Sequence, residues 1–190
     1  EDLQLRERQD ADAAAKRLAS SARRKIEAYG RTRRSADQQK LRIKDLAALR
    51  ALGLRDHLGI EIGGTGCFTV RSETWRSVVL ATILRPRMYH HRFIATDHIV
   101  SRLVEEGYVH GDFIKLTKDL ADAMRNLDPE FLTPWEAVHR YLQALTTAGL
   151  TEQQRFSFAL KTGLAERWRD WEVNEQKKIE RRNSISSLVS

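Results

Sequence analysis

Apolar residues recur at intervals of three and four along most of the chain, which is the spacing of amphipathic helices that pack by one face. This pattern predicts helices over 72–84, 96–106, 117–127, 134–148 and 164–182. The start of the fourth is the best defined, because Thr133-Pro134-Trp135-Glu136 combines an N-cap, a proline at the first helical position and a capping glutamate. The chain is therefore expected to be mainly α-helical.

The first 52 residues are expected to form two further helices. Apolar residues at every fourth position over 18–26 give the first helix a thin stripe, and Gly30 is expected to end it. Ser35-Ala36-Asp37-Gln38 has the spacing of a capping box, so it is expected to open a second helix that runs to about Leu52.

Two interruptions of the helical pattern predict short β-hairpins. Over 57–71, apolar residues alternate with small or polar ones on either side of Gly63-Gly64-Thr65-Gly66, which is expected to form the turn. A second hairpin is expected over 108–117, with its turn at His110-Gly111-Asp112. Thr151-Glu152-Gln153-Gln154 instead has capping-box spacing and predicts another helix.

The charge balance favours a polyanionic partner. The chain has 33 Lys and Arg against 26 Asp and Glu, a formal net charge of +7. Nucleic acid is the first candidate for such a protein and an anionic lipid surface the second. One segment, residues 23–34, is strongly basic and contains the single acid Glu27. Its cations are Arg23, Arg24, Lys25, Arg31, Arg33 and Arg34.

The single cysteine, Cys67, excludes an internal disulfide and a cysteine-rich zinc site. A reducing location is therefore expected, in the cytoplasm or wherever the DNA lies. No stretch approaches the roughly 20 apolar residues of a membrane span. The chain has no signal-peptide pattern, and its start at Glu1 suggests a piece of a longer protein. No cofactor or metal is expected, because adjacent His90 and His91 point to different faces of a helix.

Residues 72–117 follow the order helix, short helix, turn, helix and hairpin. Within them, 100–109 followed by 113–117 resembles the recognition helix and wing of a MarR-type winged helix-turn-helix. The resemblance covers about a quarter of the chain, and the expected wing is shorter and more acidic than in that family. It implies double-stranded DNA binding, with the helix in the major groove and the wing beside it.

This resemblance assigns two sets of DNA-contacting residues. If the apolar positions of the expected helix face the core, small and polar side chains remain to approach base edges. These base-facing residues are Thr96, His98, Ser101 and Arg102. Basic residues just before the helix, together with the basic segment over 23–34, are expected to contact phosphates. The residues before the helix are Arg85, Arg87 and Arg92.

The expected organisation is a basic helical arm over 1–52, a winged-helix-like domain over 57–127, a helical bundle over 130–182 and a flexible tail over 183–190. The preferred function is DNA binding without enzymatic activity, in regulation, replication or mobile-element DNA processing. Residues 133–151 repeat the pattern of the expected recognition helix, with spaced apolar residues that end at a glycine. They are interpreted as a helix of the bundle, or alternatively as a second, wingless copy of the same unit.

Two other functions are weighed against DNA binding. The N- and C-terminal helices have apolar stripes too thin to fold alone, so they could pair with a partner protein or a second copy in an assembly module. "GIEIGGTGCFTV" also resembles the phosphate-binding hairpin of sugar kinases and actin-like ATPases, although Glu61 stands where that family has aspartate. The alternative is a tight turn that requires glycine, and no ATP-dependent activity is expected.

Overall fold

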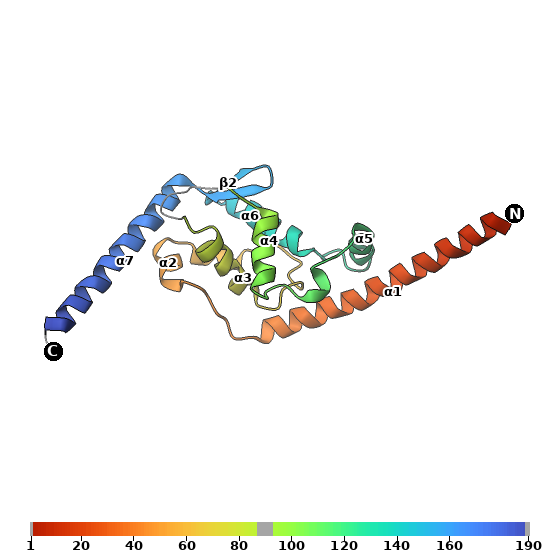
Figure 1. The fold of residues 1–190 in the computed structure, drawn as a ribbon, viewed down its shortest axis with the longest axis horizontal. Helices are drawn as coiled ribbons and strands as arrows, with labels where there is room; N and C mark the ends of the chain where they lie inside the picture. Colours follow the sequence, from red (N-terminus) through yellow and green to blue (C-terminus); the bar gives the residue numbers. More distant parts are fainter. Residues whose placement is uncertain (1, 87–92, 189–190) are drawn as a thin grey trace.

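The expectation of a mainly helical chain with a short β-hairpin is confirmed (Figure 1). The computed structural model describes residues 2–86 and 93–188. Its α-helices are α1 (Asp2–Gln38), α2 (Leu46–Ala51), α3 (Ser72–Val78), α4 (Thr96–Glu105), α5 (Lys118–Leu127), α6 (Pro134–Thr147) and α7 (Thr162–Leu188). A π-helical turn continues α3, and two 3-10 turns lie in the connections. These turns are Val79–Ile83, Arg55–Gly59 and Gly111–Phe113.

The ends of α6 are those predicted from its capping residues. The Thr133 side chain accepts a hydrogen bond from the backbone N–H of Glu136, whose carboxylate accepts one from the Thr133 N–H at 2.8 Å. Burial alone would raise the pKa of Glu136, but hydrogen bonds from Arg125 and Thr133 lower it, so the capping carboxylate stays charged. Gly149 follows the helix with a φ of 79°, a left-handed conformation suited to a helix end.

The N-terminal arm is one continuous helix, so the predicted break at Gly30 and restart at Ser35 are wrong. The helix continues because residues on both sides of the glycine are buried, and α1 packs along α5. This packing offsets the cost of about 1 kcal/mol of a glycine inside a helix. The other predicted helix is reduced to α2, in which Leu49 is fully buried. Figure 1 shows the N-terminal part of α1 projecting from the body.

The sheet has three antiparallel strands in the order β1-β3-β2. These are β1 (Ile94–Ala95), β2 (Thr151–Gln154) and β3 (Ser157–Leu160). The hairpin therefore lies over 151–160, where a helix was predicted, and that prediction is wrong. The Thr151 hydroxyl lies 2.8 Å from the Thr146 hydroxyl, which ties the first strand residue to the last turn of α6 instead of capping a new helix.

Neither of the two predicted hairpins forms in residues 57–71 and 108–117, all of which are described. The segments pair with each other instead, through a single antiparallel bridge between Phe68 and Val109. Phe68 is fully buried and stacks on Trp75 with the ring centroids 4.5 Å apart. Burial of this ring holds the first segment in the core, so it cannot form an exposed hairpin. The strand–turn–strand on which the kinase-like resemblance depended is therefore absent from this described segment.

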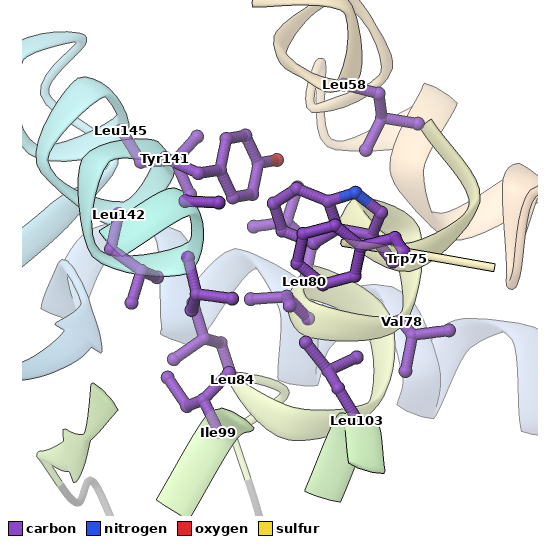
Figure 2. Packing of buried hydrophobic residues seen from close by; sticks show 14 of the residues in the cluster. Leu58, Trp75, Val78, Leu80, Leu84, Ile99, Leu103, Tyr141, Leu142 and Leu145 are labelled. Carbon is purple, nitrogen blue, oxygen red and sulfur yellow. The ribbon is translucent and has the colours of Figure 1, made fainter. Parts of the chain in front are cut away.

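The core is built around Trp75 on α3 (Figure 2). Tyr141 on α6 meets its ring edge-on at 5.4 Å, and Ile99 and Leu103 of α4 are fully buried in the same cluster. Strand β1 follows the α3 segment and pairs with β3, which follows α6. One core and one sheet thus join residues on both sides of the boundary expected near 128–130.

Helix α7 contributes only its first turns to this core. Leu164 and Trp168 are buried, as their predicted stripe requires, and Trp171 is half-buried. Further along, Val173 and Ile179 are about half exposed, at 49% and 50%. Figure 1 shows the C-terminal part of α7 extending away from the body, on the side opposite to the start of α1.

Candidate nucleic-acid interface

Helix α4, the predicted recognition helix, presents a mixed and mostly acidic surface. His98 and Ser101 are exposed, as predicted. Arg102 forms ion pairs with Glu105 and Glu106, at 3.9 and 4.0 Å. Carboxylates that neutralise the only arginine of this helix disfavour the approach of a phosphate backbone.

Thr96 is fully buried, so its predicted base-facing position is wrong. Its hydroxyl donates a hydrogen bond to the backbone carbonyl of Phe156 at 3.0 Å, and it lies 3.1 Å from Nδ1 of His139. The residue therefore fastens the start of α4 to α6 and to the turn of the β2–β3 hairpin. A lone threonine at the start of a helix pattern gives no signal of this role.

The predicted wing after α4 is also wrong. A 3-10 turn, Gly111–Phe113, occupies the place of its loop, and Phe113 is buried against the Tyr29 ring of α1. The Lys25 ammonium donates a hydrogen bond to the backbone carbonyl of Asp112 at 2.6 Å. This segment is held by α1 and is not free to project as a wing.

A helix followed directly by a hairpin does occur, in α6 and β2–β3. We call this pair the α6–hairpin unit, residues 134–160. Its hairpin turns through Arg155 and Phe156, and Arg155 has a φ of 54°. Phe156 is 61% exposed, although its ring packs edge-on against Trp135 at 5.8 Å. The hairpin therefore runs back along α6, with its turn beside the first turn of that helix.

The outer face of α6 carries a row of exposed polar side chains, Arg140, Gln143 and Thr147. These positions recur along one side of a helix of 3.6 residues per turn. Gln143 stands one turn after His139, whose ring packs against Phe156 and Phe158 of the hairpin. The exposed polar row consequently borders the row that faces the hairpin.

The side chains that join α6 to the hairpin form a packed ring cluster. His139 stacks on Trp135 with the ring centroids 4.6 Å apart. Burial lowers the pKa of the His139 imidazole, which favours the neutral ring. Nδ1 of this ring lies within hydrogen-bonding distance of the Thr96 hydroxyl. This cluster fixes the hairpin relative to α6.

Most cations of the predicted phosphate-contacting set are available on the surface. Arg23, Arg24, Arg31, Arg33 and Arg34 are exposed along α1. Lys25 is instead engaged with Asp112.

Arg85 also has structural partners. It contacts Glu172 of α7 and lies 4.0 Å from the Asp45 carboxylate, which joins the end of the α3 segment to two other elements. Arg87 and Arg92 lie outside the described residues, as do His90 and His91.

Neither a metal cluster nor a membrane-spanning helix is found in the described ranges. No group of three or more His, Cys, Asp or Glu side chains in residues 2–86 and 93–188 is arranged to hold a metal ion. Within the same ranges, no helix is both long and apolar enough to cross a membrane. Comparison with protein families, with curated proteins and with solved structures finds no match to this chain.

Proposed function

We propose that the protein binds double-stranded DNA through the α6–hairpin unit. The observation that carries the proposal is the direct succession of a helix with an exposed polar row and a hairpin packed along it. That succession is the one that the winged helix-turn-helix resemblance required, and it occurs at α6 instead of α4. Helix α4 packs against α6. In this proposal α4 has the role of the helix that supports a recognition helix.

The exposed side chains suit distinct roles on a duplex. Arginine and glutamine make paired hydrogen bonds to guanine and adenine edges in the major groove, so we assign Arg140 and Gln143 to the bases. Arg155, at the hairpin turn, is assigned to a phosphate next to the groove. Among the described residues, neither Arg140 nor Arg155 uses its guanidinium in an internal ion pair or hydrogen bond. Both cations are therefore free to meet an anionic partner.

The basic residues of α1 supply a second, electrostatic contact. Figure 1 places α1 and the hairpin on different sides of the body, so the two surfaces would meet different segments of nucleic acid. Contacts of this kind strengthen binding without reading sequence, and they weaken as salt rises.

Titrating a labelled duplex with the protein over a series of salt concentrations tests the proposal. We expect log affinity to fall linearly with log salt. The variant Arg140→Gln/Arg155→Gln should bind about tenfold more weakly at low salt, because it loses one base contact and one phosphate contact. Its salt slope should be shallower by about one, because without the Arg155 phosphate contact one fewer counterion is released on binding.

The matched control is Arg6→Gln/Arg8→Gln, which removes the same charge from an exposed part of α1. It should bind almost as tightly as the wild type. Equal weakening by both variants, or affinity without any salt slope at low ionic strength, contradicts the proposal.

An assembly module is the second candidate, and the two projecting helices favour it. Val173 and Ile179 of α7 are exposed apolar side chains outside the core, which a partner protein would cover. Light scattering separates the two functions, because a discrete oligomer without affinity for duplex DNA supports assembly alone.

A further inference from the structure

A cleft of about 580 Å³ lies between α3 and the segment 39–44 that follows α1. This volume is within the range of about 300–1,000 Å³ that small-molecule sites occupy. Hydrogen bonds hold the segment at both ends. The Lys44 N–H donates to the Ser77 hydroxyl at 3.0 Å, and the Gln39 side-chain amide donates to the Thr69 carbonyl at 2.7 Å. The cleft is thus preformed.

The outer wall of the cleft is strongly basic. Lys40, Arg42 and Lys44 line it, and no carboxylate does. All three are exposed, and none forms an ion pair within the part of the chain that the structure describes. Unpaired cations gathered around one concave surface attract an anion and raise its local concentration.

The remaining walls combine hydroxyl groups with apolar surface. Thr74 of α3 and Tyr108 line the cleft, and neither side-chain hydroxyl has a hydrogen-bond partner among the described residues. Ile43, Val70 and Val78 add apolar surface beside them. A ligand that matches both the basic wall and the apolar walls carries several acceptor oxygens at one end and a largely apolar body at the other.

The approach to the cleft favours a polymeric anion. From Arg23 to Lys44 the chain is rich in arginine and lysine, and its only acids are Glu27 and Asp37. This segment comprises the last part of α1 and the wall of the cleft, so exposed cations lead along the helix to the concave site. Successive phosphates of a nucleic-acid strand can contact cations all along this track, whereas a small free anion contacts only the cations at the cleft.

We propose that the cleft binds one nucleotide unit of a single strand of nucleic acid. The phosphate lies against Lys40, Arg42 and Lys44, and the base lies against the Tyr108 and Val78 side. A base in a duplex is stacked between its neighbours and cannot enter a cleft of this kind, so the ligand is an unpaired nucleotide. This inference does not depend on duplex binding by the α6–hairpin unit.

Fluorescence anisotropy with a labelled oligothymidylate tests the site. The variant Lys40→Gln/Arg42→Gln/Lys44→Gln should bind the strand at least about tenfold more weakly at low salt, because three phosphate-neutralising cations are lost. The control Arg6→Gln/Arg8→Gln/Lys16→Gln removes equal charge from the exposed part of α1 and should change affinity by less than about twofold. Arg140→Gln/Arg155→Gln, which alters the proposed duplex site, should also change strand affinity by less than about twofold, and this separates the cleft from the duplex site.

Competition identifies the source of the nucleotide. Free thymidine monophosphate and inorganic phosphate should displace the strand only at far higher concentrations than unlabelled oligothymidylate. A strand containing photoreactive 5-iodouracil should cross-link to Tyr108. The proposal is overturned if the cleft and control variants weaken binding equally, if the monophosphate competes as well as the strand, or if the wild type does not bind the strand.

Discussion

Replacing Trp75 with alanine is expected to lower the free energy of unfolding by about 3–5 kcal/mol, a large part of the roughly 5–15 kcal/mol that stabilises a typical domain. The indole is fully buried, stacked on Phe68 and in edge contact with Tyr141. The guanidinium of Arg76, itself buried, lies 5.2 Å from the indole centroid. Alanine would therefore leave a cavity and strip a buried cation of an aromatic face.

Urea unfolding followed by circular dichroism measures this loss. The control is Trp171→Ala on α7, where the ring is only half-buried and less apolar surface returns to water. Its expected cost is about 1 kcal/mol. If the two substitutions cost the same, the core is not centred on α3.

Replacing Gly64 with alanine is expected to cost about 2–5 kcal/mol, for two separate reasons. Its φ of 59° strains any residue with a side chain by about 1–2 kcal/mol. A β-carbon there would also lie 2.5 Å from the Leu132 Cγ and 2.6 Å from the Glu130 carbonyl oxygen. Relieving an overlap with the backbone adds about 1–3 kcal/mol.

Gly63 provides a control that separates these two terms. Its φ is also positive, at 66°, but a β-carbon there meets nothing within 4 Å. Gly63→Ala should therefore cost only the backbone strain of about 1–2 kcal/mol. Thermal unfolding of both variants decides the matter, because equal costs would mean that the loop does not pack against Leu132 as described.

The helices could be predicted from the sequence because local residues specify their ends. Thr133, Pro134 and Glu136 define the start of α6 through their own side chains, and Gly107 and Gly149 adopt positive φ just after α4 and α6. These signals depend only on residues within one turn of each other. Gly30 gave a misleading signal, since its effect on the helix is overridden by the packing of α1 on distant α5.

The strands could not be predicted in the same way. The hairpin turns through Arg155 and Phe156, without the glycine or asparagine that usually accompanies a positive φ. Thr151 and Gln154 have the spacing of a capping box, but the pairing of β2 with β3 determines their conformation. The glycines at 63–66 suggested a hairpin turn, whereas Gly64 and Gly66 allow close approach of Leu132 and Tyr29.

The helix that we propose meets DNA is α6 and not the predicted α4, and this difference also depends on contacts between residues far apart in the sequence. The resemblance to a winged helix-turn-helix predicted the recognition helix at 96–106, because a glycine and a short apolar stretch follow it. The burial of Thr96 and the ion pairs of Arg102 are tertiary contacts, and no local pattern reveals them. The sequence signal for α6 as an alternative was that residues 133–151 repeat the pattern of spaced apolar residues ending at a glycine. The hairpin that follows was not predicted, because Thr151 and Gln154 have the spacing of a capping box.

Directed cleavage of bound DNA tests most directly whether α6 is the helix that meets the duplex. An iron chelate attached to a cysteine in Gln143→Cys or in Ser101→Cys cuts DNA close to α6 or to α4, since both positions are exposed. The native Cys67 does not compete for the label, because it is buried and burial raises the pKa of its thiol. Strong, localised cleavage from position 143 and little from position 101 is the predicted result. Cleavage from position 101 with none from position 143 would contradict the account.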